Sequence, residues 1–251
     1  MVTSKNNFMP EALKNFNLPY QPNASLSSFT TFQLGGPCRS LIQCATPEDL
    51  QSTITYLHEH NKDFILIGGG SNLVVSDQGI ECYVIRYLTE QPIIQQHETI
   101  LEVSGSTLLD DLVVFAAQAG LDGINYCSGI PGTVGGAVVG NAGAFGQQIG
   151  DVLLSADLLD RSGQRHTALQ TDLDFRYRYS NLRESDHIVS SVRLQLQAGD
   201  SNVLKKEREK ILATRREKHP NLAKEPCAGS FFRNIEPTSK AGKRQAAGWF
   251  L

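Results

Sequence analysis

The sequence predicts an α+β fold in two parts, and three observations support this prediction. Predicted strands and helices are mixed along the 251 residues without the regular alternation of a doubly wound sheet. Two glycine-rich segments, 68–72 and 128–146, both fall in the first part. A long charged helix near residue 201 opens the second part and carries most of the local basic charge. We therefore expect a larger glycine-bearing unit followed by a smaller one.

The first elements have clear end signals. Residues 40–45 alternate as a strand does, and 46–61 reads as a helix with Thr46 as its N-cap and a proline at its first position. Residues 64–67 form a short buried strand that runs directly into the first glycines, and a second strand is expected over 73–75. Two further strands are predicted, over 81–87 and 100–105.

The following elements complete the pattern. Residues 106–120 read as an amphipathic helix with Ser106 as N-cap and Gly120 as its C-terminal stop. A short helix is expected over 134–140. The remaining predictions are a hairpin of strands 151–160 and 164–170, a strand over 187–197, a helix over 201–218, an extended segment over 229–234 and a helix from residue 239.

Composition excludes several classes of protein. Hydrophobic residues make up 40% of the chain and charged residues 20%, which is enough for one large domain or two modest ones. The formal net charge of -3 argues against nucleic acid as the main partner. No run of about eighteen apolar residues is present, so no membrane-spanning helix is expected. The first residues lack the apolar region of a secretory signal, and we expect a cytoplasmic protein.

Cysteine and histidine patterns predict no metal site. The five cysteines contain no C-x-x-C pair and are expected to be free thiols in a reducing compartment. His58 and His60 are two positions apart, on different sides of a helix, and read as surface residues.

The glycine-rich segments carry no charge. Main-chain N–H groups in such loops bind anions, so two of them predict a cradle that holds a large phosphate-bearing cofactor from two sides. Taken singly, either loop could equally be a flexible surface loop. The chain has no G-x-G-x-x-G after a strand and no G-x-x-x-x-G-K-[ST], which disfavours a Rossmann or P-loop nucleotide site.

Five motifs in order resemble one known family. They are "FTTFQLGGP" (29–37), "IGGGSNLVVSDQG" (67–79), "GIPGTVGGAVVGNAGAFG" (129–146), "FRYRYS" (175–180) and "AGSFFRN" (228–234). Together they resemble the compact subtype of the UDP-N-acetylenolpyruvoylglucosamine reductases, flavoenzymes of bacterial cell-wall synthesis. The likeness covers nearly the whole chain from Asn23 onward.

The resemblance implies a fold, a reaction and a domain division. It implies an FAD-binding fold of the vanillyl-alcohol-oxidase (PCMH) type over 23–198, after an N-terminal segment 1–22, with a separate α+β substrate-binding domain over 199–251. It implies that NADPH reduces FAD and that the flavin passes hydride to the enolpyruvyl ether of a UDP-sugar, giving UDP-N-acetylmuramate for peptidoglycan. A monomer that binds neither nucleic acid nor membrane is expected.

The resemblance also implies roles for individual residues. Arg178 matches the arginine that stabilises negative charge on the substrate carboxylate, and Ser230 matches the proton donor. Without the resemblance, an exposed ion pair for Arg178 and a turn hydroxyl for Ser230 would be the better readings, and a solvated charge for Lys218 is an alternative that stays open. The implied substrate contacts are Tyr177, Lys218 and Asn234. The implied cofactor contacts are Gly68, Gly69, Gly70, Ser71, Asn72, Gly129, Ile130, Pro131, Gly132, Thr133, Gly135, Gly136, Asn141 and Gly143.

One part of the family pattern has no counterpart here. Family members continue past the position that matches Leu251 and carry a glutamate that works with the arginine and the serine. We therefore expect an incomplete substrate-binding domain, with FAD binding kept and turnover weak or absent if the chain ends there. The alternatives are a flavin-binding protein without catalysis and another flavin oxidoreductase of the same fold; the motifs at 175–180 and 228–234 disfavour the latter, since they match the substrate half of the family.

Overall fold

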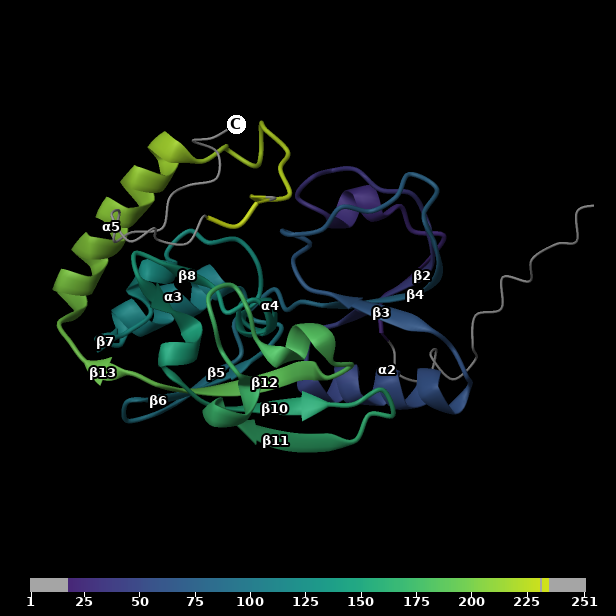
Figure 1. Ribbon diagram of the computed structural model, residues 1–251, viewed down its shortest axis with the longest axis horizontal. Helices are drawn as coiled ribbons and strands as arrows, with labels where there is room; N and C mark the ends of the chain where they lie inside the picture. The colour runs from purple at the N-terminus through teal and green to yellow at the C-terminus, as the bar shows by residue number, and fades with distance from the viewer. Residues whose placement is uncertain (1–17, 231, 235–251) are drawn as a thin grey trace, which may run out of the picture.

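Two β-sheets with helices packed on them make up the computed structural model, which describes residues 18–230 and 232–234 (Figure 1). The first sheet has the strand order β1-β2-β4-β3, in which β2 and β3 both run parallel to β4 and β1 is antiparallel to β2. Its strands are β1 (Tyr20–Pro22), β2 (Cys38–Cys44), β3 (Phe64–Ile67) and β4 (Ile80–Tyr87).

Helix α2 (Pro47–Glu59) makes the crossover between β2 and β3. The Thr46 hydroxyl accepts a 3.1 Å hydrogen bond from the Asp49 N–H, and the Asp49 carboxylate accepts one of 3.3 Å from the Thr46 N–H. This capping box satisfies two main-chain donors at the helix start and confirms the predicted N-cap. The apolar face of α2 packs on the first sheet and also reaches two strands of the second sheet through Leu159 and Ile188.

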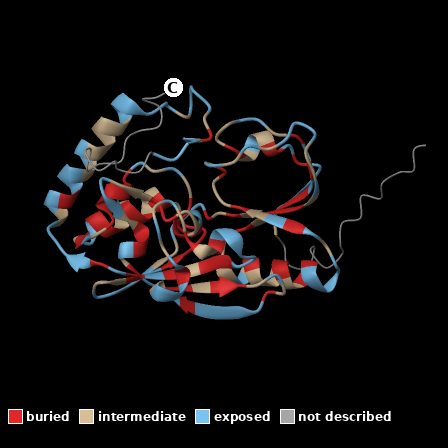
Figure 2. Ribbon diagram, in the orientation of Figure 1, coloured by how far each residue is buried: buried red, intermediate tan, exposed pale blue. Residues whose placement is uncertain are grey.

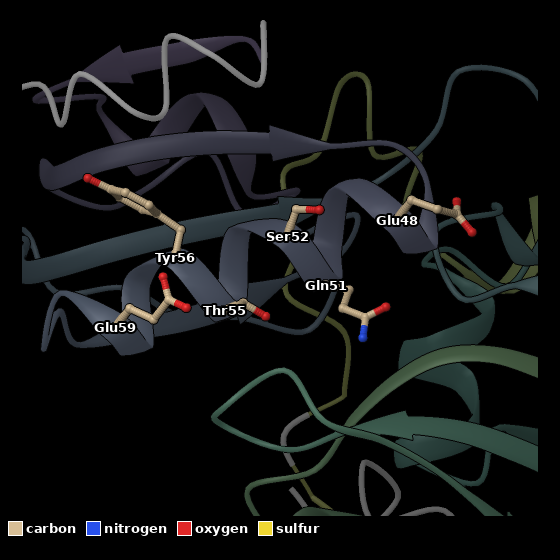
Figure 3. A pocket seen from close by; sticks show the side chains of 6 residues that line it. All are labelled: Glu48, Gln51, Ser52, Thr55, Tyr56 and Glu59. Carbon is tan, nitrogen blue, oxygen red and sulfur yellow. The ribbon is translucent and has the colours of Figure 1, made fainter.

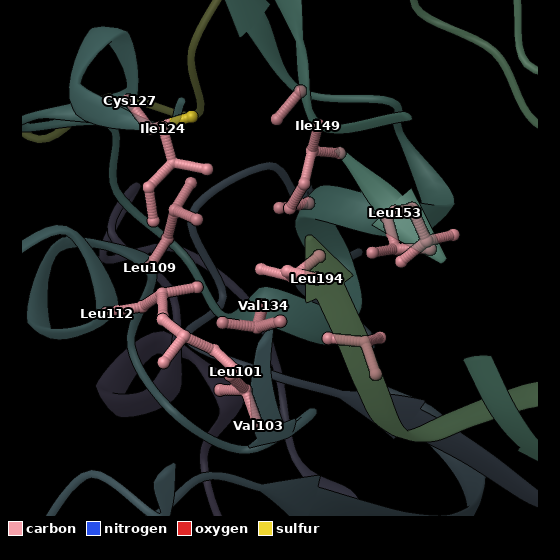
Figure 4. Packing of buried hydrophobic residues seen from close by; sticks show 14 of the residues in the cluster. Leu101, Val103, Leu109, Leu112, Ile124, Cys127, Val134, Ile149, Leu153 and Leu194 are labelled. Carbon is pink, nitrogen blue, oxygen red and sulfur yellow. The ribbon is translucent and has the colours of Figure 1, made fainter. Parts of the chain in front are cut away.

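The second sheet is antiparallel throughout and has the order β11-β10-β12-β6-β5. Its buried side chains form the largest core cluster together with α3 and α4, as Figure 4 shows. The elements are β5 (Ile94–His97), β6 (Ile100–Ser104), β10 (Leu153–Leu159), β11 (Arg165–Leu169), β12 (Ile188–Gln195), α3 (Leu109–Gln118) and α4 (Val134–Val139).

Tyr87 connects the two sheets. This residue ends β4 of the first sheet, and its buried hydroxyl donates a 2.8 Å hydrogen bond to the Ser190 carbonyl in β12. The hydroxyl of Ser104, at the end of β6, lies 2.8 Å from the same oxygen. Because these polar groups are satisfied only when both sheets are in place, the pair of sheets acts as one framework for the loops between them.

Helix α5 (Ser201–Lys218) lies along the outside of the second sheet's helices, against α3 and η2 (Asn125–Cys127), and most of its surface is exposed (Figure 2). Asp200 caps its start by accepting hydrogen bonds from the N–H groups of Asn202 and Val203. Its bounds match the predicted helix.

Short elements complete the described chain. They are η1 (Leu26–Phe29), β7 (Leu121–Asp122), β8 (Gly143–Ala144), β9 (Gln147–Gln148), η3 (Ile149–Asp151), η4 (Gln170–Leu173), η5 (Asn181–Glu184) and β13 (Gln197–Ala198). Within the described residues, no helix is both long and apolar enough to cross a membrane.

Two local predictions are wrong. Ser106 does not cap α3, whose N-cap is Leu108, because the Ser106 hydroxyl donates instead to the Ala45 carbonyl at 2.6 Å. Residues 73–75 form no strand, and the chain there is a loop. The described residues of the predicted extended segment 229–234 have no regular secondary structure, and the helix predicted from residue 239 lies outside the described residues. The predicted division at 198/199 stays a prediction.

Candidate functional site

The two glycine-rich segments lie against each other. We call Gly68–Asn72, which follows β3, the first glycine loop, and Gly129–Thr133, which precedes α4, the second glycine loop. The Ser71 hydroxyl donates a 3.1 Å hydrogen bond to the Pro131 carbonyl across this contact. The two loops therefore lie side by side, as a ligand cradle made from both of them requires.

Close approach explains why glycine occupies the first loop. A Cβ on Gly68 would lie 2.6 Å from the Thr133 hydroxyl oxygen, which is shorter than any normal contact. Gly70 has φ +66, and a Cβ there would lie 2.0 Å from the Phe29 carbonyl oxygen. Both positions exclude a side chain, so the main chain itself forms the surface of the cradle.

The main chemical feature of this contact is a set of main-chain N–H groups without a hydrogen-bond acceptor. Within residues 18–230 and 232–234, none of the main-chain N–H groups of the first glycine loop donates a hydrogen bond to another residue. The same holds for the N–H groups of Gly132 and Thr133 in the second loop. All of these residues except the exposed Asn72 are buried or half-buried. Since N–H groups in such places are nearly always paired, the row of free donors indicates an anionic or strongly polar ligand.

Other N–H groups near the cradle are already paired. Gly129 donates to the Asp110 carboxylate at 2.7 Å, and Ile130 donates to the Cys127 carbonyl at 2.9 Å. At the start of α4, Gly135 donates to the Gly105 carbonyl at 3.0 Å and Gly136 donates to the Thr133 hydroxyl at 3.3 Å. These residues shape the second glycine loop and dock α4, and their main-chain donors are not free for a ligand.

The segment that carries Ser230 crosses the first glycine loop. Cys227 donates its N–H to the Thr31 carbonyl at 3.1 Å, and the Thr31 hydroxyl donates to the Cys227 carbonyl at 2.7 Å. Thr31 also donates its N–H to the Gly70 carbonyl at 3.1 Å. A Cβ on Gly229, which has φ +86, would lie 3.7 Å from the Asn72 side-chain oxygen. Ser230 is thus placed beside the first glycine loop.

Arg178 sits on a tight turn. Arg176 and Tyr179 exchange two main-chain hydrogen bonds of 3.0 and 3.1 Å, so Tyr177 and Arg178 occupy the tip. Arg178 is exposed and has the left-handed φ of 56. Arg176 instead pairs with Asp174 in an exposed ion pair.

Sequence reasoning missed Arg215 on α5. Its side chain covers the second glycine loop, with its Cδ only 3.2 Å from where a Cβ on Gly129 would lie. Its Nε is buried and has no hydrogen-bond partner among the described residues. Burial lowers the pKa of Arg215, and the positive charge of Arg178 lowers that pKa further. The sequence offers no signal for Arg215, because it is one of several basic residues in the same charged helix.

Cys127 lies close enough to Arg215 and Arg178 for their positive charges to act on its thiol. Burial raises the pKa of the Cys127 thiol to about 12, although Arg215 and Arg178 both act to lower it. Cys127 is therefore a neutral, inert thiol. All five cysteines are free, as predicted.

The remaining predicted residues lie in different surroundings. Tyr177 is half-buried, and Lys218, the last residue of α5, is exposed, as is Asn234. Gly143 lies in β8, which pairs with β9. The side chain of Asn141 is fully engaged inside the protein, with hydrogen bonds to Gly150, Gln148 and Arg176.

A surface groove lies away from the glycine loops. It has a volume of about 460 Å³ and runs along one face of α2 (Figure 3). Its lining is Glu48, Gln51, Ser52, Thr55, Tyr56 and Glu59. Two carboxylates and no Lys or Arg side chain line this groove, so its chemistry does not suit a phosphate-bearing ligand. No group of three or more His, Cys, Asp or Glu side chains in the described part of the chain could hold a metal ion.

Comparison with known proteins agrees with this geometry. Residues 38–168 match the model of the FAD binding domain family. The chain is 33% identical over 221 residues to UDP-N-acetylenolpyruvoylglucosamine reductase of Listeria innocua, covering 88% of this chain and 73% of that protein.

Solved structures show the same fold. The crystal structure of UDP-N-acetylenolpyruvylglucosamine reductase from Thermus caldophilus matches with a TM-score of 0.72 at 30% identity, over 93% of this chain and 78% of that one. 6-Hydroxy-D-nicotine oxidase from Arthrobacter nicotinovorans matches with a TM-score of 0.54 at 20% identity, over 72% and 42% of the two chains, and shares the fold alone. The α+β fold with an FAD binding domain is therefore confirmed, and this chain belongs to the UDP-N-acetylenolpyruvoylglucosamine reductase family.

Proposed function

We propose that this chain binds FAD and uses it to reduce the enolpyruvyl ether of UDP-N-acetylglucosamine-enolpyruvate to UDP-N-acetylmuramate, a step of bacterial peptidoglycan synthesis. Membership of the reductase family supports the reaction. The single observation that carries it in the structure is the row of unpaired main-chain N–H groups in the first glycine loop, which lies against the second loop.

The free donors fit a dinucleotide diphosphate. In our proposal, the N–H groups of Gly68–Asn72 together with those of Gly132 and Thr133 bind the two phosphates of FAD. An uncharged cradle suits this task because glycine lets the main chain approach the ligand and no carboxylate repels it. Gly129, Ile130, Pro131, Gly135, Gly136 and Gly143 keep the cradle in shape.

The chemistry then falls to two side chains. When bound, FAD supplies the hydride that the terminal carbon of the enolpyruvyl group receives. The Arg178 guanidinium binds the substrate carboxylate and stabilises the negative charge that develops there, and it does so without losing its own proton. The Ser230 hydroxyl donates a proton to the neighbouring carbon, which is strongly basic at that moment. The position of Ser230 beside the first glycine loop supports this role.

Substrate recognition is assigned to three polar residues. Lys218 provides an ammonium group for the UDP diphosphate, Asn234 provides an amide for the sugar or a phosphate oxygen, and Tyr177 lines the site beside Arg178. Lys218 is supported by its place at the end of α5, the helix that also carries Arg215 over the second glycine loop.

Three finer points belong to the same proposal. NADPH is the hydride donor to FAD, the protein is a monomer, and it works in the cytoplasm. Free thiols at all five cysteines support a reducing compartment. Light scattering of the purified chain after size exclusion tests the monomer.

The reaction is tested by anaerobic spectroscopy of the purified chain with FAD. We expect the oxidised flavin spectrum to bleach with NADPH and to return when the enolpyruvyl UDP-sugar is added, but not when simple alcohols are added. Arg178→Ala should slow the return at least about a hundredfold, whereas Arg176→Ala, which removes an exposed ion pair two residues away, serves as the matched control. Reoxidation by alcohols, or by oxygen only, would overturn the proposal.

A further inference from the structure

The turn that carries Arg178 needs support from outside itself. Its tip holds Arg178 in a left-handed conformation that residues with a side chain rarely adopt. Two main-chain hydrogen bonds close the turn, and the exposed Arg183 guanidinium donates a 3.0 Å hydrogen bond to the Arg178 carbonyl. An exposed guanidinium on such a turn has a defined position only if neighbouring groups fix the turn's main chain.

Asn141 supplies that support from the end of α4. Its side-chain N–H₂ group donates a 2.8 Å hydrogen bond to the Arg176 carbonyl, the same oxygen that closes the turn with Tyr179, and a second bond of 2.9 Å to Gln148. Its side-chain oxygen accepts a 3.1 Å hydrogen bond from the Gly150 N–H. Asn141 is only 1% exposed, and both of its amide hydrogens are used in these bonds.

A second bond joins the other side of the turn to the same helix. The buried Ser180 hydroxyl donates a 2.8 Å hydrogen bond to the Val139 carbonyl, the last residue of α4. Arg176 at the start of the turn and Ser180, the residue that follows the turn, are therefore both tied to the C-terminal end of α4. The N-terminal end of the same helix is capped by Thr133 of the second glycine loop.

We propose that Asn141 is a positioning residue for Arg178, and that α4 sets the distance between the cofactor cradle and the substrate carboxylate. With a rise of about 1.5 Å per residue, the helix separates its two ends by about 10 Å. Because Asn141 clamps the Arg176 carbonyl, the guanidinium keeps its place when substrate binds and needs little further ordering. This inference rests on the proposed function, and it gives Asn141 a different role from the flavin contact that the motif implies.

Asn141→Gly tests the proposal without changing the main-chain preference, since Asn141 has φ 44 and glycine accepts that conformation. Asn61→Gly is a matched control, because Asn61 follows α2 with φ 50 and has an exposed side chain. For Asn141→Gly we expect the Kd of FAD and the rate of flavin reduction by NADPH to stay within about twofold of the wild type, and flavin reoxidation by the enolpyruvyl UDP-sugar to slow at least about tenfold. A tenfold rise in the Kd of FAD with normal reoxidation would overturn the proposal in favour of a flavin contact.

Hydrogen exchange provides a readout that needs no turnover. The Tyr179 N–H closes the Arg178 turn, so its exchange should accelerate at least about tenfold in Asn141→Gly, while the Val192 N–H in the core of β12 should not change. If the wild-type chain reduces no substrate, the proposed function fails, yet this measurement still tests Asn141. Should Asn141→Gly fold poorly and alter Val192 as well, Asn141→Asp keeps the size and the acceptor for the Gly150 N–H, and replaces the two donors by an oxygen that repels the Arg176 carbonyl. Unchanged exchange at Tyr179 in the folded variant would refute the role.

Discussion

The Ser71 hydroxyl donates a 3.1 Å hydrogen bond to the Pro131 carbonyl, which joins two glycine loops that are 60 positions apart in the chain. One loop follows a strand of the first sheet, and the other precedes a helix that packs on the second sheet. The cradle is therefore a product of both sheets, and the bond between its halves should influence cofactor affinity more than it influences folding.

Ser71→Ala should raise the Kd of FAD about fivefold, because one neutral hydrogen bond contributes about 1 kcal/mol. Fluorescence titration of the flavin measures this, with circular dichroism to confirm the fold. Ser76→Ala removes an exposed hydroxyl four residues beyond the first glycine loop, one that accepts a hydrogen bond from the Gln78 N–H, and should leave the Kd unchanged. Equal effects of the two variants would contradict a role for the loop–loop bond.

Gly70→Ala should destabilise the protein by more than about 3 kcal/mol, because it combines a left-handed φ with a main-chain clash at the Phe29 carbonyl. Gly146→Ala isolates the conformational part of this cost. Gly146 has φ +84 with open space around it, so about 1–2 kcal/mol is expected. Urea unfolding of the two variants gives the comparison, and similar losses would show that the close contact is not rigid.

Asp110→Asn should lower the free energy of unfolding by about 1–3 kcal/mol. The Asp110 carboxylate accepts hydrogen bonds from the Gly129 N–H and from Arg208 on α5, whose side chain is only 14% exposed. Asp186→Asn is the control, because the pair that Asp186 forms with Arg161 is exposed on both sides and should contribute less than about 1 kcal/mol. Chemical unfolding measures both, and equal losses would mean that α5 does not depend on this contact.

Arg215→Gln should raise the Kd of FAD about tenfold, since Arg215 is a partly desolvated cation placed over the second glycine loop. The salt dependence of the Kd should become weaker in the variant. The neighbouring Arg216 is exposed, and Arg216→Gln should leave both quantities unchanged. The proposal that Arg215 provides charge at the cradle fails if the two variants bind FAD alike.

Stability should fall at high pH. Burial raises the pKa of the Cys44 and Cys127 thiols from 9.0 to about 12. Between these values the unfolded chain has lost each thiol proton while the folded protein keeps it, so the contribution is complete below about pH 9 and is lost as the pH rises through about 12. The free energy of unfolding should decrease by about 1.4 kcal/mol per pH unit for each thiol. Urea unfolding between about pH 9 and pH 11 measures the slope, which Cys44→Ala and Cys127→Ala should each make shallower; an unchanged slope would contradict the assignment.

Much of the fold can be predicted because its signals are local. The capping box at Thr46 and Asp49, and the charged stretch of α5, depend on neighbours within four residues. Ser106 shows where such reasoning fails. Its hydroxyl resembles an N-cap, yet it donates to Ala45 and lies against Ser104, because the meeting of the two sheets offers partners that the local sequence does not reveal.

The candidate site could be predicted in part, because some of its signals are also local in the sequence. The glycine loops are visible as uncharged runs, and the structure brings them together as expected. Arg215 and the clamp made by Asn141 depend on contacts between distant segments, such as Asn141 with Arg176 across 35 positions. No periodicity or spacing in the sequence reports such contacts, so the supporting groups of the site emerge only from the folded chain.

The pairing of Thr31 with Cys227 spans 196 positions and fastens the Ser230 segment onto the first glycine loop. During synthesis, the first glycine loop must therefore wait until the segment around Cys227 has left the ribosome before the two can pair. Closing so large a loop is entropically unfavourable and comes late in folding. A nascent chain would thus complete both sheets before the Ser230 hydroxyl could be placed beside a substrate. The chain would acquire its fold first and its catalytic site later.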